Sequence, residues 1–167
     1  MTLSTPTIEP RYFRDVIGHL PTGVTVVAGR DSETGAPAGL VVGTFQSLSL
    51  DPPLVTFSVA TTSSSWPKVR TGGFFSASVL ADGQHHVCQA MSSKQGDKFA
   101  QLDWHESAEG TPQITGAHAW IDCKTVQELE GGDHVIVVAE VLRLQAGGGR
   151  PLIFHRGRLG GYCEPNP

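Results

Sequence analysis

Apolar and polar residues follow each other along the chain in short runs, a pattern that predicts many strands and few helices. Residues 8–20 differ, because apolar side chains recur there every three or four positions and predict one amphipathic helix. Runs rich in Val, Ile and Phe predict strands at residues 24–28, 38–45, 54–60, 74–80, 117–126, 134–144 and 152–155. The turn-rich segment 29–37 joins the first two of these strands as a hairpin.

Three short segments, 67–70, 84–91 and 98–102, have the pattern of helices, and the polar segment 103–116 predicts a loop. Many short strands with few helices are typical of a β-barrel or a β-sandwich. The chain has no internal repeat and no linker, and its 167 residues suit one domain that spans residues 1–167. The pattern therefore predicts a mainly β, single-domain protein.

Composition and charge exclude several classes of protein. Hydrophobic residues make up 39% of the chain and charged residues 17%, so the sequence is too apolar for a disordered protein. The net charge of −4 and the lack of a Lys/Arg block argue against a nucleic-acid partner. No apolar run approaches the ~20 residues of a membrane span, so we expect no membrane partner.

The N-terminus and the cysteines both bear on where in the cell the protein is found. Residues 1–10 are polar and lack the basic start and apolar centre of a signal peptide. Cys88, Cys123 and Cys163 lie far apart without a CxxC pattern. Such an odd and sparse set fits a reducing compartment, which predicts a cytoplasmic protein.

A run of hydroxyl side chains, residues 61–65, lies between a predicted strand and the predicted helix at 67–70. Backbone N–H groups at a helix start attract anions, and hydroxyls add donors, so the run can bind a phosphate. Alternatively, Ser65 simply caps the helix. The residues by themselves favour capping.

Other candidate chemistry is weak. His134 follows a Gly-Gly-Asp turn, where it can face a pocket or be an ordinary turn residue, and the second interpretation is favoured. His85, His86 and Cys88 lie close in sequence, but no second pair of ligands stands at zinc-site spacing, so we expect no metal. No dinucleotide fingerprint, P-loop or serine-hydrolase motif is present.

Six segments, in this order along the chain, resemble those of a known family. They are PTGVTVV (21–27), GLVVGTFQSLSLDPPL (39–54), SSSW (63–66), DKFA (97–100), GDH (132–134) and PLIFHRG (151–157). Over residues 13–162 the chain is similar to the short-chain flavin reductases, the small reductase components of two-component flavin monooxygenases. The resemblance implies an FMN-binding split β-barrel of Greek-key type with a few short flanking helices and a core at about 11–162.

The resemblance also implies an activity. It predicts an NAD(P)H:flavin oxidoreductase that transfers hydride from NADH or NADPH to FMN or FAD and supplies reduced flavin to a separate monooxygenase. It further implies a homodimer whose subunits complete the sites together. A flavin-binding carrier or sensor without turnover is the alternative. An enzyme like pyridoxamine-phosphate oxidase is disfavoured, because the chain is poor in Arg and Lys for a phosphorylated substrate.

Site residues follow from the matched motifs. The resemblance raises phosphate binding above capping for the hydroxyl run and places His134 near both the nicotinamide and the flavin, with His155 also at the nicotinamide. Hydride transfer needs no acid or base from the protein. Gly43 is expected to let a flat ligand approach the backbone. The residues implied for the flavin are Leu40, Val41, Val42, Gly43, Thr44, Ser47, Ser58, Val59, Ala60, Ser63, Ser64, Ser65, Trp66, Lys98 and Phe99.

Overall fold

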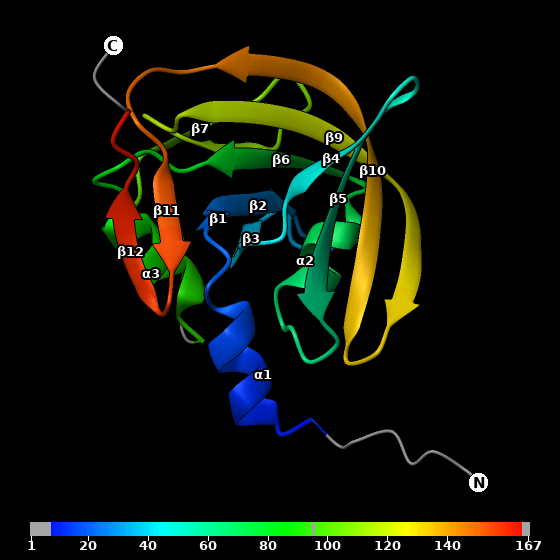
Figure 1. Cartoon of the computed structure of the whole chain (residues 1–167). Coiled ribbons are helices and arrows are strands. Elements are labelled where there is room, and N and C mark those ends of the chain that lie inside the picture. The colour runs from blue at the N-terminus through cyan, green and yellow to red at the C-terminus, as the bar shows by residue number, and fades with distance from the viewer. Residues whose placement is uncertain (1–7, 95, 165–167) are drawn as a thin grey trace, which may run out of the picture.

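The protein folds around one strongly curled antiparallel sheet, shown in the computed structural model of Figure 1. The structure describes residues 8–94 and 96–164. The large sheet contains β2 (Thr25–Arg30), β3 (Pro37–Val42), β4 (Gln46–Leu50), β5 (Pro53–Ala60), β6 (Phe74–Val79), β9 (Ala119–Gly131) and β10 (His134–Ala146). Their order across the sheet is β3-β2-β6-β9-β10-β5-β4.

Curvature of the sheet brings its two halves together. The long hairpin of β9 and β10 has register shifts at Val138/Ala139 and at Val141/Arg143, and such bulges bend and twist a strand. As a result β3 and β5 contact each other although four strands separate them in the sheet order. The C-terminal ends of β3 and β5 therefore border one space.

Smaller elements complete the molecule. A three-stranded sheet joins β1 (Thr22–Gly23), β11 (Leu152–His155) and β12 (Arg158–Gly161), and a short hairpin joins β7 (Trp104–Glu106) and β8 (Pro112–Ile114). The helices are α1 (Pro10–Ile17), α2 (Trp66–Thr71) and α3 (His85–Ser92). Figure 1 shows α1 standing below the body of the molecule, and it has no buried residue.

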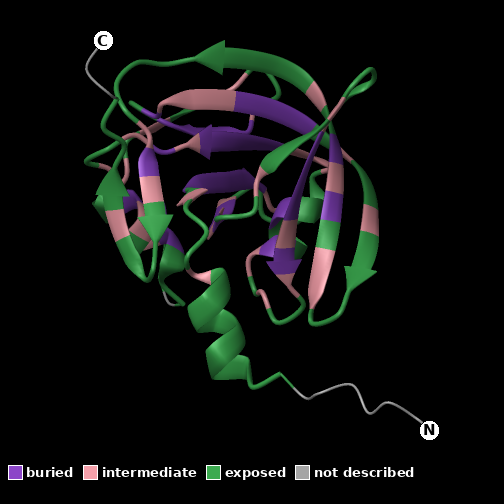
Figure 2. Cartoon of the chain, in the orientation of Figure 1, coloured by how far each residue is buried: buried purple, intermediate pink, exposed green. Residues whose placement is uncertain are grey.

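The core lies inside the curled sheet in two clusters, visible as purple segments in Figure 2. In one, the ring of Phe57 meets those of Trp66 and Phe75 edge-on, with centroids 5.3 and 5.5 Å apart. The other packs Leu80, Met91 and Leu152 between the sheet, α3 and β11. Both clusters use the strand residues that the apolar runs indicate.

The mainly β architecture and most predicted elements are confirmed, but several details differ. The helix at 8–20 is shorter, and β3 ends at Val42, before Phe45. Residues 98–102 form successive turns instead of a helix, because Asp97 Oδ1 accepts the N–H of Phe99 and the Phe99 ring is buried. The predicted loop at 103–116 contains the β7–β8 hairpin, and β4 and β12 were not predicted.

Over the described part of the chain, no helix is long and apolar enough to cross a membrane. The expectation about a signal peptide rests mostly on residues 1–7, which lie outside the described residues.

Candidate functional site

A cleft of about 430 Å³ opens where the ends of β3 and β5 meet α3 and the first residue of β10. It collects residues that lie far apart in the sequence but are brought together by the curled sheet. The residues that line it are Leu40, Val41, Val42, Gly43, Thr44, Ser58, Val59, Ala60, Ser63, Met91, Ser92 and His134. All but Met91 and Ser92 are among the residues implied for the flavin and nicotinamide.

Thr44 ties the two strands of the cleft together. Its Oγ1 accepts the backbone N–H of Ser58 at 2.9 Å and lies 3.2 Å from the carbonyl oxygen of Ser58, to which it donates. The hydroxyl of Ser58 also donates to Thr44 Oγ1, at 3.2 Å. The segment that follows β3 is thereby held against β5, although Thr44 itself lies outside both strands.

His134 stands at the mouth of the cleft, opposite Ala60 in the β10–β5 register. Its Nδ1 lies 2.6 Å from Asp133 Oδ1. Hydrogen bonding to His134 and its nearby charge lower the pKa of the Asp133 carboxyl. Thr61 fixes the turn further, because its N–H and hydroxyl donate to the Asp133 carbonyl at 3.0 and 3.1 Å. Among the described residues nothing bonds to His134 Nε2, which leaves that atom to a ligand.

A second cavity, of about 330 Å³, lies on the other side of Gly39 and holds two lysines. Lys98 Nζ donates to Ser65 Oγ at 3.0 Å, to the Met91 carbonyl at 2.8 Å and to the Gly39 carbonyl at 3.3 Å. Burial, and secondly the charge of Lys68, lower the pKa of Lys98. Within the described chain neither lysine has an ion pair, so an anion bound here would relieve their repulsion.

The hydroxyl run divides its roles differently from the expectation. Ser65 is the N-cap residue of α2, as expected, but the hydroxyl that bonds to the helix start is that of Ser63, whose Oγ accepts the N–H of Trp66 at 3.2 Å. Ser65 makes no capping bond and instead accepts from Lys98. Ser64 is exposed and lines neither cavity.

Trp66 and Phe99, both implied for the flavin, have their rings in the core. Each side chain is 3% exposed. Trp66 Nε1 donates to Glu128 at 3.2 Å, and the Phe99 ring packs against Trp104 with centroids 5.8 Å apart. Phe99 borders the cavity of the two lysines, whereas Trp66 borders neither cavity. Their burial indicates that the two rings support the walls of the site by packing.

Two further residues lie away from the cleft. Ser47 is exposed on β4 and does not line it. His155 lies on β11 and lines a separate cavity of about 420 Å³ with Pro21, Arg158 and Leu159.

The structure adds a second reason for glycine at position 43 beside the expected approach of a ligand. A Cβ atom built on Gly43 would lie 2.9 Å from Thr22 Oγ1, so a side chain here would force the Thr22 hydroxyl to move. Gly43 still borders the cleft through its backbone.

An apolar cavity of about 680 Å³ adjoins the cleft, because Gly43 and Thr44 line both. Phe13, Ile17 and Leu20 of the α1 region form one wall, and Phe154 on β11 forms another. Sequence reasoning missed these residues as candidates for the site. The signal was present in the helix periodicity, which predicts an apolar face but not what that face covers.

The cleft, the lysine cavity and the apolar cavity together suit a flat ligand with an anionic tail and a second flat partner. Comparison with known proteins agrees with this geometry. The flavin reductase like domain matches residues 17–162. The chain is 44% identical over 157 residues to a flavin reductase of Pseudomonas putida, covering 93% of this chain and 92% of the relative.

Two further relatives have the same character. The reductase subunit HsaB of a flavin-dependent monooxygenase from Rhodococcus jostii is 42% identical, over 95% of this chain and 80% of its own. The crystal structure of nitrilotriacetate monooxygenase component B from Mycobacterium thermoresistibile superposes with a TM-score of 0.88 at 38% identity, over 94% of this chain and 89% of that one.

A structure of the NADH:FAD oxidoreductase SgcE6 from Streptomyces globisporus, in complex with NAD and FAD fragments, matches with a TM-score of 0.86 at 32% identity, covering 95% and 98% of the two chains. With the domain match extending over nearly the whole chain, the protein belongs to the family of flavin reductase like domains.

Proposed function

We propose that this protein is a cytoplasmic NAD(P)H:flavin oxidoreductase that transfers hydride from NADH or NADPH to FMN or FAD and supplies the reduced flavin to a separate monooxygenase. The observation that carries the proposal is the cleft at the ends of β3 and β5, which opens at Gly43 and Thr44 into an apolar cavity. Two flat rings can therefore lie face to face, one in each space. The relatives named above support the same activity.

In this proposal the flavin ring lies against the backbone of residues 40–44, and its phosphate reaches the hydroxyl run and Lys98. Ser63 and Ser65 are positioned to donate to phosphate oxygens, and Lys98 and Lys68 offset the charge. The bound flavin supplies an acceptor for a hydride. The protein contributes the stacking geometry and hydrogen-bond donors toward negative charge on the ring.

His134 is proposed to contact the nicotinamide or the flavin edge with Nε2. Asp133 holds the imidazole through Nδ1, so the ring keeps one orientation while Nε2 faces the cleft. His155 does not line the cleft. It borders a separate cavity of about 420 Å³ beside Pro21 and Leu159, and we assign it only a peripheral contact with the nicotinamide nucleotide.

The active form is proposed to be a homodimer. Apolar side chains of α1 and its flanks are exposed in the single chain, Tyr12 at 66% and Leu20 at 62%. Leu129 and Ile136 face each other across β9 and β10 and are also exposed. Surfaces of this kind favour a second copy as their cover.

The test measures oxidation of NADH and of NADPH with FMN and with FAD, on purified protein whose flavin content is first determined. Turnover with excess free flavin supports the proposal. Tight binding of flavin without oxidation of either nicotinamide would establish a carrier or sensor instead. Transfer to an oxygenase is tested separately, by coupling the reductase to a two-component oxygenase and measuring hydroxylated product.

A further inference from the structure

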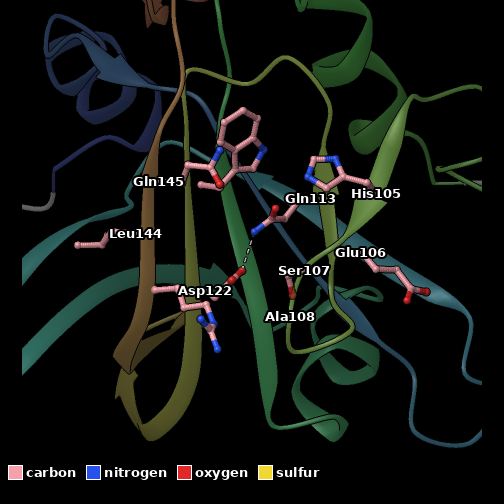
Figure 3. Close-up of a pocket in the computed structure, with 10 residues that line it drawn as sticks. His105, Glu106, Ser107, Ala108, Gln113, Asp122, Leu144 and Gln145 are labelled. Atoms are coloured by element: carbon pink, nitrogen blue, oxygen red, sulfur yellow. Dashed lines mark hydrogen bonds between the residues drawn. The ribbon is translucent and has the colours of Figure 1, made fainter.

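We propose a second ligand site, at the far end of the sheet from the cleft, that binds a small planar organic cation with N–H donors. The site is a cavity of about 570 Å³ between the β7–β8 hairpin and the ends of β9 and β10 (Figure 3). It shares no lining residue with the cleft. Leu144 of this cavity and His134 of the cleft lie ten residues apart on β10, so the two cavities border different parts of that strand.

A buried carboxylate forms the back of this cavity. Asp122 is 4% exposed, and its Oδ1 accepts the hydroxyl of Ser76 and the amide N–H of Gln113, the latter at 2.8 Å. Among the described residues no donor reaches Asp122 Oδ2, and no cation pairs with the carboxylate. Because no buried side-chain oxygen of the described residues lacks a hydrogen-bond partner, Oδ2 must be open to the cavity, where a cationic donor can reach it.

Gln113 supplies a second acceptor beside the first. Because a carboxylate only accepts, the amide nitrogen of Gln113 must face Asp122, which turns Oε1 the other way, as Figure 3 shows. Gln113 is 8% exposed, and in the described part of the chain nothing donates to its Oε1. The cavity thus presents two acceptor atoms from two buried side chains.

The other carboxylates near the cavity already have partners. Glu106 pairs with Arg30, and Glu109 lies 3.6 Å from Arg143. Arg143 also stands opposite Asp122 in the β9–β10 register but forms no ion pair with it, so Asp122 Oδ2 is the carboxylate oxygen left for a ligand.

A chain of hydroxyl groups connects the rim to Asp122. Ser107 Oγ lies 2.8 Å from Thr111 Oγ1, which lies 2.6 Å from Ser76 Oγ, and these bonds fix the hydroxyl that donates to the carboxylate.

Two aromatic rings select the shape of the ligand. Trp120 and His105 line the cavity with centroids 6.2 Å apart. Trp120 Nε1 is already bonded to the Ile114 carbonyl at 2.8 Å, so the indole offers only its ring surface. A cation spread over a flat group can contact that surface while it donates two N–H bonds, which is the chemistry of an amidinium or guanidinium on a planar body.

Benzamidinium is the probe, and benzoate is its counterpart of the same shape and opposite charge. Calorimetry on the flavin-loaded protein is expected to show saturable one-to-one binding of benzamidinium and none of benzoate. Asp122→Asn replaces the free oxygen with a donor and should weaken binding at least about tenfold, the size of a lost charge-assisted bond. Glu140→Gln, which removes an exposed carboxylate of β10 outside the cavity, should leave binding unchanged.

A second variant guards against misfolding of Asp122→Asn. Gln145 is exposed at the rim, so Gln145→Lys adds a repelling charge without touching the buried network, and it should also weaken binding about tenfold. Gln127→Lys, an equal change on exposed β9 away from the cavity, is its control. Equal binding by all variants, equal binding of benzoate, or displacement of flavin by benzamidinium would overturn the proposal. Because no arm measures turnover, its failure is distinct from failure of the reductase activity.

Discussion

At the scale of single residues, Gly43 is a glycine that another side chain of the protein approaches closely. Adding a Cβ at this position meets the hydroxyl of Thr22 at 2.9 Å, whereas the Cβ of Thr22 is 3.6 Å away. The clash is therefore with a single side-chain atom. Removing that atom should remove most of the need for glycine.

Gly43→Ala is expected to lower the free energy of unfolding by about 1–3 kcal/mol, the usual cost of overpacking. Thr22→Ala should restore most of that loss in the double variant. Denaturant unfolding of the wild type, both single variants and the double variant gives the coupling. If the two effects simply add, Gly43 is required for a reason other than Thr22.

His134 is the second prediction for a single residue. His134→Ala should slow hydride transfer about tenfold or more, because a hydrogen-bonding group facing the cleft is lost while the fold keeps its core. Stopped-flow reduction of the flavin by NADH measures this. His86→Ala, on the exposed side of α3, is the control and should not change the rate.

The partner of His134 adds a dependence on pH. Because the pKa of Asp133 is lowered in the fold, its contribution to stability is present above the unfolded pKa and is lost as pH falls through the folded pKa. Asp133→Asn should therefore remove part of the loss of stability on the acid side. Unchanged acid denaturation in this variant would mean that the Asp133–His134 bond contributes nothing to folding.

A substitution at Lys98 tests whether this residue acts on the flavin phosphate or on the flavin ring. Lys98→Met should weaken FMN binding at least about tenfold, because the positive charge that offsets the phosphate is lost. Riboflavin, which has no phosphate, should bind both proteins alike. Lys94→Met removes an exposed charge outside the cavity and serves as the control. An equal loss for riboflavin would assign Lys98 to the support of β3 and not to phosphate binding.

At the scale of elements, the site depends on a hydrogen bond between two segments that are not neighbouring strands of the sheet. Thr44 lies just beyond β3, and its Oγ1 accepts the N–H of Ser58 on β5. Thr44→Val keeps the shape but removes the hydroxyl, and should lower the free energy of unfolding by about 1 kcal/mol and weaken flavin binding. Thr44→Ser should keep both. Melting curves with and without FMN separate the two effects; a stable Thr44→Val with normal FMN affinity would contradict this role.

Elements with strong periodicity were predictable, and those fixed by long-range contacts were not. The apolar run of β10 predicts its strand, and hydroxyls before α2 predict a capped helix start, although which serine caps depends on the turn geometry. Three-residue strands such as β7 carry too few positions for a period. Residues 98–102 show a helical pattern, but burial of Phe99 and the three bonds of Lys98 impose turns.

The candidate site was likewise predictable only in part. A resemblance of short motifs found most of the cleft, because residues 40–44 and 58–60 are contiguous stretches of the chain. It did not find Met91, Phe13 or Phe154, which reach the two spaces only because the sheet curls and α1 stands below it. It also placed Trp66 at the flavin, whereas its ring fills the core. Motifs locate backbone segments, and side-chain direction requires the fold.

At the scale of the whole molecule, α1 buries none of its residues against the described part of the chain. Its apolar side chains occupy one face, yet none is buried: Phe13 remains 53% exposed and Ile17 48% exposed. Burying an apolar side chain stabilises by about 1.5–3 kcal/mol, so a second copy that covers this face gains substantially. The same face forms a wall of the apolar cavity beside Gly43, which links assembly to the site.

Phe13→Ser together with Ile17→Ser should therefore shift the protein from dimer to a monomer of 17.7 kDa and should weaken turnover with NADH as the wall is lost. Sedimentation velocity over a range of concentrations measures the first effect, and steady-state kinetics the second. Arg11→Ser, on the exposed polar side of α1, is expected to change neither. A double variant that remains dimeric would place the interface on β9 and β10 instead, where Leu129→Ser and Ile136→Ser should then separate the subunits.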